Sequence, residues 1–328
     1  MHAYHRRWLA TAILLAGLVS VSCKGKVSKA TSERATTLAE LYSLRSVPTF
    51  DINLSSEDIE ALRINPKSWV IGDFEYAGKK YGSVSLRLKG HRSMRSIDDK
   101  PAIKLRFNKG KDHRGRSFLG VHRVTLNNLV EDPTMIREYL AYQLAREVGL
   151  PVPQAGFANI RINGELRGLY LVVETPDKDF LKRQFGSGKG ELYEGEYGCD
   201  LFVADVDGFE QDRGKKDRNP LRRFAEAAEA KGDEVWRPDG PMTLEHLSLF
   251  LAFSTYVGDF DGYHHSHNYR IYRDPKNDTW QFMSWGLDRA FFKSLPPFSS
   301  QGLLAKRCYA QADCRKAYLL NLRRVHDA

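Results

Sequence analysis

Residues 123–151 read RVTLNNLVEDPTMIREYLAYQLAREVGLP, which contains a strand, a helix and the signals that bound the helix. A strand is predicted over residues 123–129. Asp132-Pro133-Thr134 then opens a helix over residues 135–148, and the GLP of residues 149–151 ends it. The helix is predicted to bury an apolar stripe made of Ile136, Leu140, Leu144 and Val148.

Strands are also predicted on both sides of this stretch, where apolar and polar side chains alternate. Turn signals at Ala77-Gly78 and Asn163-Gly164 join neighbouring strands into hairpins. Ser55 and Asp58 resemble a capping box and start a short helix over residues 55–62. The first half is therefore predicted to be mainly antiparallel sheet with one prominent helix. Its other strands and hairpins cover residues 48–54, 73–81, 83–89, 102–107 and 158–173.

The second half of the chain is predicted to contain more helix and longer loops than the first. Helices are predicted over residues 221–230 and 244–257, and a hairpin is predicted over residues 269–285. Residues 184–190 and 211–219 are rich in Gly, Lys and Asp and are predicted to be loops.

Composition excludes several classes of protein. The chain has 328 residues, of which 42% are hydrophobic, so it can bury a core and is neither disordered nor fibrous. Four cysteines are too few for a disulfide-built scaffold. The net charge of +9 raises the question of nucleic-acid binding, but the basic residues are scattered and no binding motif accompanies them. We therefore expect no nucleic-acid partner.

The first 22 residues have the pattern of a secretory signal. A basic start precedes the uncharged run WLATAILLAGLVSV of residues 8–21, which is too short for a transmembrane helix. Cys23 then occupies the position of the acylated cysteine of a lipoprotein signal, although Ser20 replaces the usual Leu. We expect an exported protein with residues 23–47 as a polar tether and a lipid on Cys23 as its membrane contact. A plain signal peptide is the alternative.

The remaining cysteines suit an exported protein. Cys308 and Cys314 are close in sequence and are predicted to form a disulfide, which leaves Cys199 unpaired. A zinc site would need more ligands at tight spacing, and no CxxC is present.

The densest group of polar residues is 259–268, which reads DFDGYHHSHN and directly follows an apolar helix. Asp288 stands at the end of the next hairpin, which brings it back beside that loop. Two carboxylates and the Asn268 amide can hold a hard divalent cation, while one carboxylate accepts the proton of a substrate hydroxyl. Protein kinases use the same order of residues. We expect Asp261 and Asp288 to be functional and Asp259 to be structural.

Three histidines in the same loop, His264, His265 and His267, could bind a transition metal. The other histidines are scattered, so we expect these three to position the loop or contact substrate instead.

A resemblance to a known family extends over residues 48–320. It is carried by LRLKG (86–90), KPAIKLRF (100–107), LNNLVEDPTMIREYLAYQLAREVGLPVP (126–153), INGELRGLYLVVE (162–174), DFDGYHHSHNYRIYR (259–273) and WGLDRAF (285–291). On these segments the sequence resembles the CotH kinase family, the spore coat protein H relatives of atypical secretory kinases.

The resemblance implies an α+β, bilobal, atypical protein-kinase-like fold. Its N-lobe (48–174) would be an antiparallel sheet with one long helix, and its C-lobe (175–328) would be mainly helical. It also implies that ATP and Mg²⁺ (or Mn²⁺) are cofactors, with Asp261 as the catalytic residue and Asn268 and Asp288 as metal ligands. The acceptor would be a Ser or Thr of a surface or coat protein.

The resemblance further implies which residues bind the nucleotide. No G-x-G-x-x-G occurs, and residues 89–93 (KGHRS) look like a substitute phosphate loop. Lys104 would contact the α/β-phosphates, with Lys100 as the alternative, and Glu138 would pair with that lysine. The backbone of Glu174 would recognise adenine. The expected nucleotide-binding residues are Lys89, Arg92, Lys100, Lys104, Glu138 and Glu174.

Two features depart from the family pattern. Gly262 follows Asp261 where several related kinases carry Arg, which leaves the packing of this loop open. The chain ends at Ala328, where relatives continue with helical sequence, so we expect a truncated C-lobe.

The predicted function is that of an exported, ATP- and metal-dependent protein kinase. One alternative is a non-catalytic surface, coat or adhesion protein with the same fold. Another is a metal-dependent phosphohydrolase that uses the histidine cluster.

Overall fold

The computed structural model describes residues 37–109 and 115–328. The predicted signal peptide and Cys23 lie outside these residues, as does most of the predicted tether. Within the described ranges, no helix is long and apolar enough to cross a membrane.

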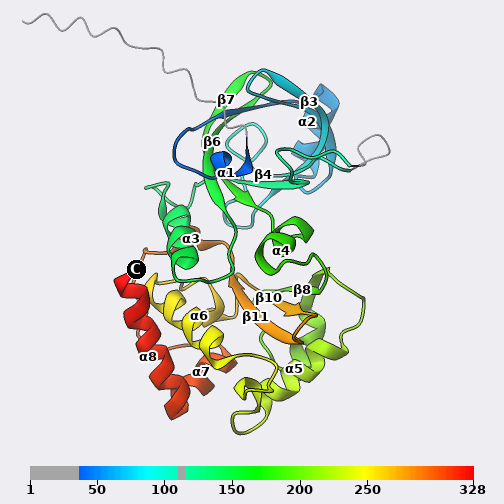
Figure 1. Ribbon diagram of the computed structural model, residues 1–328. Coiled ribbons are helices and arrows are strands. Elements are labelled where there is room, and N and C mark those ends of the chain that lie inside the picture. Colours follow the sequence, from blue (N-terminus) through cyan, green and yellow to red (C-terminus); the bar gives the residue numbers. More distant parts are fainter. Residues whose placement is uncertain (1–36, 110–114) are drawn as a thin grey trace, which may run out of the picture. The chain divides into compact units, whose positions relative to one another are not determined.

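In the described part of the chain, seven strands close into a barrel (Figure 1). Their order around the barrel is β1-β2-β3-β4-β5-β7-β6. Neighbouring strands are antiparallel except β1 and β6, which run parallel and close the barrel, with Thr49 opposite Asn159. The strands are β1 (Thr49–Asn53), β2 (Val70–Tyr76), β3 (Lys79–Lys89), β4 (Ala102–Arg106), β5 (Arg123–Asn127), β6 (Ala155–Ile162) and β7 (Glu165–Glu174).

Aromatic side chains fill the barrel interior. The ring of Phe118 packs edge-on against those of Phe50 and Phe74, with centroids 5.4 and 5.1 Å apart. Because side chains alternate between the two faces of a strand, the intervening residues of β3 and β4 point outward. Leu41 and Tyr42 join this core, so folded structure begins ahead of residue 48.

Helices α1 (Leu38–Leu41), α2 (Ser56–Ile64) and α3 (Arg137–Glu147) accompany the barrel strands in sequence. Ser55 caps α2 by accepting a hydrogen bond from the Asp58 backbone N–H, as predicted. The predicted apolar stripe of the long helix is wrong at Ile136 and Leu140, which are 39% and 44% exposed. The buried residues of α3 are Glu138, Tyr139, Ala141, Tyr142 and Ala145. These residues, two of them Ala, let α3 pack closely against η5 (Leu287–Arg289).

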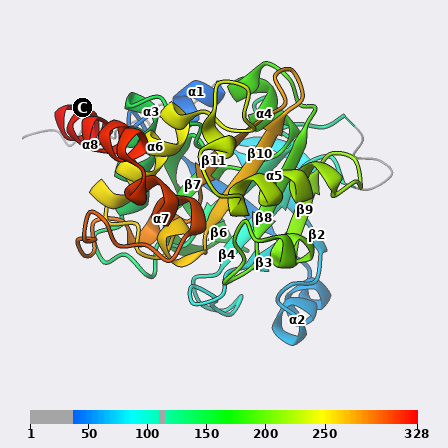
Figure 2. The same ribbon diagram turned by 90° about the horizontal axis from the view of Figure 1, so that it is seen from below.

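The second half holds a four-stranded sheet of order β11-β10-β8-β9 and several helices. Figures 1 and 2 show α8 packed beside α6 and α7. A disulfide joins Cys308 to Cys314 at the α7–α8 junction, which confirms the predicted pairing. The elements are α4 (Lys178–Phe185), β8 (Glu191–Gly195), η2 (Val203–Gly208), β9 (Phe209–Arg213), α5 (Asn219–Glu229), η3 (Glu234–Trp236), α6 (Leu244–Tyr256), η4 (Tyr263–His265), β10 (Tyr269–Asp274), β11 (Thr279–Ser284), α7 (Leu303–Ala310) and α8 (Ala312–Asp327).

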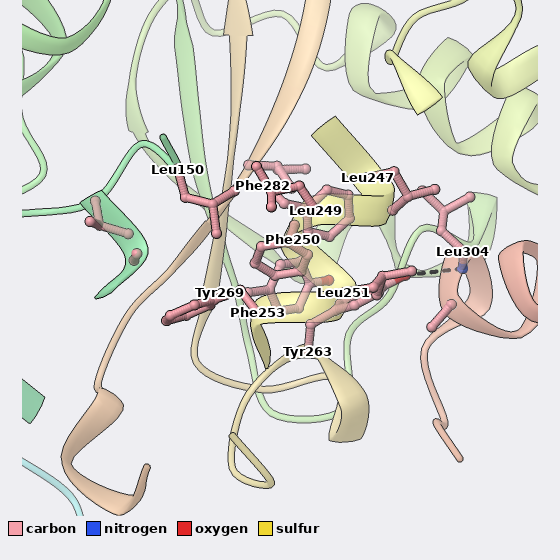
Figure 3. Close-up of a cluster of buried hydrophobic side chains, with 14 of the residues drawn as sticks. Leu150, Leu247, Leu249, Phe250, Leu251, Phe253, Tyr263, Tyr269, Phe282 and Leu304 are labelled. Carbon is pink, nitrogen blue, oxygen red and sulfur yellow. Dashed lines mark hydrogen bonds between the residues drawn. The ribbon is translucent and has the colours of Figure 1, made fainter. Parts of the chain in front are cut away.

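Helix α6 lies at the centre of the second hydrophobic core (Figure 3). Phe250 packs against Phe282 of β11 with ring centroids 5.1 Å apart. Tyr263, in the loop after α6, stacks edge-on against Phe282, and its hydroxyl accepts a hydrogen bond from the Leu304 backbone N–H. The core therefore fixes the polar loop that follows α6.

The predicted bilobal protein-kinase-like fold, with an antiparallel-sheet N-lobe and a mainly helical C-lobe, is wrong. The first half is a closed barrel that contains a parallel pair, and the second half contains a sheet of its own. The prediction missed β8 and placed a loop over part of β9. Barrel closure depends on pairing between strands that are far apart in sequence, which local periodicity does not report.

Candidate active site

A cavity of about 660 Å³ contains most of the predicted site residues. Its lining comes from the end of β3 and the following loop, from residues 127–131, from α3, and from the loops after β8, α6 and β11. Of the predicted site residues, Lys89, Arg92, Glu138, Asp261, Asn268 and Asp288 line the cavity. Lys100, Lys104 and Glu174 are not among its lining residues.

Asp261 lies in the loop after α6, where two neighbours hold its carboxylate. Its Oδ1 is 3.3 Å from His267 Nδ1, and its Oδ2 accepts a hydrogen bond of 3.1 Å from Asn268 Nδ2. Burial raises the pKa of Asp261, but the hydrogen bond and charge of His267, with Arg289 nearby, outweigh burial and lower the pKa below its usual value. Asp261 is therefore an ionised, oriented hydrogen-bond acceptor at neutral pH.

Asp259 and Gly262 pack against each other beneath this loop. A Cβ on Gly262 would lie 2.1 Å from Asp259 Oδ2, so the loop has no room for a side chain at this position. The Asp259 side chain is buried, consistent with its predicted structural role. Burial, together with the charges of Asp261 and Asp288, raises the pKa of Asp259 to about 8.

We predict that Asp259→Asn changes how stability depends on pH. Because the pKa of Asp259 is raised on folding, the folded state holds a proton that the unfolded state releases above pH 4. Wild-type stability should therefore fall as pH rises toward 8, by about 1.4 kcal/mol per pH unit from this group. Urea unfolding from pH 5 to pH 8 should show a smaller loss in Asp259→Asn. The exposed control Asp239→Asn should keep the wild-type slope, and parallel profiles for all three proteins would contradict the prediction.

Asp288 belongs to η5, directly after β11. Gly286 has φ 66°, and a Cβ there would lie 3.4 Å from Asn268 Cγ, so the two loops meet here. Burial raises the pKa of Asp288, and the Asp261 charge adds to this, while Lys89 opposes it. A bound cation stabilises the charged form of a carboxylate that is only partly solvated.

Lys89, Asn127 and Glu138 form a chain of hydrogen bonds at the barrel side of the cavity. Lys89 Nζ donates to Asn127 Oδ1 over 2.5 Å. Asn127 Nδ2 donates to both carboxylate oxygens of Glu138, at 3.0 and 2.8 Å. Burial lowers the pKa of Lys89, whereas burial and the Asp288 charge raise the pKa of Glu138. Glu138 is thus linked through Asn127 to Lys89, the lysine that lines the cavity, whereas its predicted partner was Lys104, with Lys100 as the alternative.

Residues 90–93 form a tight turn at the cavity wall. Gly90 has φ 115°, and a Cβ there would lie 2.7 Å from Ser93 Oγ. Asn128 Nδ2 donates to the carbonyls of Ser93 and Lys100, at 2.9 and 2.8 Å, which ties the turn to β5. Arg92 extends from this turn toward Glu131, with Nε 3.9 Å from Oε2.

Lys104 and Lys100 lie elsewhere on the barrel. Lys104 is on β4 opposite Arg87 of β3, and burial with the charges of Lys89 and Arg270 lowers its pKa to about 8. Lys100 Nζ lies 5.4 Å from the centroid of the Tyr170 ring.

Glu174, buried at the end of β7, makes an ion pair with Arg183, which is partly exposed. Arg183 of α4 donates to both of its carboxylate oxygens, at 2.9 and 2.6 Å. The backbone N–H of Glu174 donates to the Gln154 carbonyl. The backbone N–H of Glu174 is therefore already engaged within the barrel.

We predict that Glu174→Gln lowers the free energy of unfolding by about 3 kcal/mol, because it leaves the Arg183 charge without its buried partner. Urea unfolding at pH 7 measures this loss. The matched control is Glu245→Gln, which breaks an exposed pair with Arg324 and should cost less than about 1 kcal/mol. Equal effects of the two substitutions would contradict a structural role for Glu174.

The three histidines do not gather around a common point. His264 is buried, its Nε2 lies 3.2 Å from Thr255 Oγ1, and burial lowers its pKa to about 4. His267 contacts Asp261, as expected for a positioning residue. Across residues 37–109 and 115–328, no three His, Cys, Asp or Glu side chains are arranged as a metal-binding group.

Sequence reasoning missed several side chains that line the cavity: Asn127, Glu131, Tyr197, Trp285 and Arg289. Four of these stand inside the segments that carry the family resemblance, which was the available signal: Asn127, Glu131, Trp285 and Arg289. Tyr197 is 79% exposed and lies edge-on to the His267 ring, with centroids 5.0 Å apart. Nothing in the local sequence marks it.

A family model described as CotH kinase protein matches residues 86–295, which include every residue placed in the cavity. The chain belongs to the CotH family. Inner spore coat protein H of Bacillus subtilis is 22% identical to it over 200 residues, 56% of this chain and 54% of that protein. Invasin CotH2 of Rhizopus delemar is 23% identical over 278 residues, 77% of this chain and 46% of that protein. This CotH chain spans about half the length of these curated relatives.

Proposed function

We propose that this chain transfers the γ-phosphate of ATP to a Ser or Thr hydroxyl of a protein outside the cytoplasm. The observation that carries the proposal is the set of side chains that line the cavity. It combines a lysine held by Asn127 and Glu138 with the Asp261–Asn268 pair and Asp288. Membership of the CotH kinase family supports the same reaction class.

The donor set fits Mg²⁺ or Mn²⁺. Asp288 offers a carboxylate and Asn268 an amide oxygen, and Mg²⁺ in phosphoryl-transfer sites typically takes few protein ligands and keeps its waters. This accords with the lack of a larger His, Cys, Asp and Glu group among the described residues. When bound, the cation would offset negative charge on the phosphates.

The chain's own residues would perform the remaining work. Asp261, oriented by His267 and Asn268, accepts the proton of the acceptor hydroxyl. Lys89 donates hydrogen bonds to phosphate oxygens, held in place by Asn127. Tyr197 and Trp285 supply aromatic surfaces beside the cavity on which a purine can stack.

The relatives' names favour a second candidate function, that of a non-catalytic surface protein. One is an inner spore coat protein and the other an invasin, and both names describe proteins found at surfaces. They also support placing this chain outside the cytoplasm. A purely structural protein would not need the ordered polar residues of the cavity.

Thermal unfolding of the purified chain, with and without Mg-ATP, separates the two functions. An enzyme should be stabilised, because a ligand that binds only the folded state raises the melting temperature. Incubation with γ-labelled ATP and a Ser-containing acceptor should then give phosphoprotein. Release of free phosphate alone would indicate a phosphohydrolase, and a lack of both stabilisation and transfer would reject the proposed function.

A further inference from the structure

An aromatic and cationic surface adjoins the cavity on the Asp261 side. Phe260 directly precedes Asp261, and its ring lies 6.0 Å from that of Phe292. The guanidinium of Arg289 and the ammonium of Lys293 lie 5.0 and 4.1 Å from the Phe260 centroid. Arg289 also lines the cavity, so the surface and the cavity are continuous.

The start of α3 extends this surface. Arg137 lies 5.5 Å from the centroid of the Phe292 ring, which places the first turn of α3 beside the 289–293 segment. Met135 and Ile136 immediately precede that turn and are 38% and 39% exposed. Phe292 is 59% exposed.

Backbone strain accompanies the exposure. Phe291 has φ 59° and is 43% exposed, and Met135 also has φ 59°. A bulky side chain in the left-handed region costs free energy, and such strain concentrates at functional sites. Here the strained residues Phe291 and Met135 expose apolar side chains to solvent, so burial within the chain does not offset the free energy of the strained backbone.

The positive charges on this surface indicate that its partner is acidic. Arg289 and Lys293 form no ion pair within 4.0 Å among residues 37–109 and 115–328, although both contact the Phe260 ring and Arg289 lies near enough to Asp261 to lower its pKa. A partner that brings carboxylates to these cations and apolar side chains to Phe291 and Phe292 would satisfy both features.

We infer that this surface docks the acceptor polypeptide through a segment that combines acidic and apolar side chains. The inference rests on the proposed function, because it takes Asp261 as the residue that meets the acceptor hydroxyl. A segment bound across Phe260 and Phe292 would place a neighbouring Ser or Thr at the Asp261 side of the cavity.

Fluorescence polarisation with three labelled heptapeptides tests the inference. Each has a central Ser: the first has Phe on both sides and two Glu at each end, the second replaces Glu by Lys, and the third replaces Phe by Ser. The first peptide should bind the full chain roughly tenfold more tightly than either of the others. Phe292→Ser and Lys293→Glu should each weaken it by roughly tenfold.

Matched controls are Leu320→Ser and Lys306→Glu, which alter exposed residues of α8 and α7 and should leave peptide affinity unchanged. Equal affinity for the three peptides, or wild-type affinity in both test variants, would overturn the inference. A dimer that Phe292→Ser dissociates in sedimentation would assign the surface to a second copy of the chain and would also overturn it. Stabilisation by Mg-ATP, measured on the same samples, reports the proposed function separately, because Phe292 and Lys293 do not line the cavity.

Discussion

Asp261→Asn is expected to lower the rate of phosphate transfer by roughly 10³-fold, the scale of a lost general base. An amide keeps the size of the side chain but cannot accept the hydroxyl proton. The variant should still be stabilised by Mg-ATP, because Asp288, Asn268 and Lys89 remain in the cavity. Labelled-phosphate transfer and thermal unfolding, measured together, check both parts.

The exposed substitution Asp239→Asn is the control, and it should keep full transfer activity. Two results would contradict the assigned role. Transfer at the wild-type rate would mean that Asp261 does not take the proton, and loss of Mg-ATP stabilisation would mean that it binds the nucleotide or metal instead.

Asp288→Asn is also expected to lose transfer, but unlike Asp261→Asn it should lose the response to Mg²⁺. It removes the carboxylate assigned to the divalent cation, so stabilisation by ATP should no longer depend on added Mg²⁺. Transfer should fall to background, since the phosphates lose the cation that offsets their charge. Titration of Mg²⁺ at fixed ATP, followed by thermal unfolding, measures the effect.

Stability in the absence of ligand provides the internal check for this variant. Burial raises the pKa of Asp288, so removing its charge should leave the ligand-free chain at least as stable as wild type at pH 7.5. Retention of the wild-type Mg²⁺ response would contradict a ligand role for Asp288.

Local sequence patterns predicted most of the individual strands and helices. The alternation of residues 102–107 placed Ile103 and Leu105 in the core, and the Asn163-Gly164 turn joins β6 to β7. The prediction failed for the order in which the strands pair. The pairing of β1 with β6 is parallel and remote in sequence, so no window of neighbouring residues contains it.

The candidate site, like the fold, could be predicted only in part. Asp261, Asn268 and Asp288 stand in short motifs, and the hairpin between them brings them to one cavity. The predicted partner of Glu138 was Lys104, with Lys100 as the alternative, and the link to Lys89 was missed because Lys89 and Lys104 stand at part-buried positions of adjacent strands. Only the closed barrel and the position of α3 determine which of them reaches Glu138.

Asn127 illustrates the same limit. An asparagine at the end of a strand is unremarkable by propensity, and its importance comes from two partners. Lys89 is on β3 and Glu138 is on α3, so their common neighbour emerges only from tertiary structure.

The parallel closure of the barrel has a consequence for how the chain acquires its fold. β1 pairs with β2, the next strand along the chain, but its other edge has no partner until β6 has been synthesised. During that interval an unpaired strand edge is open to association with other chains. Because such a distant pairing must overcome a large loop-closure entropy, barrel closure is expected to be the slow step of folding. Assistance from chaperones would therefore matter most between the emergence of β1 and that of β6.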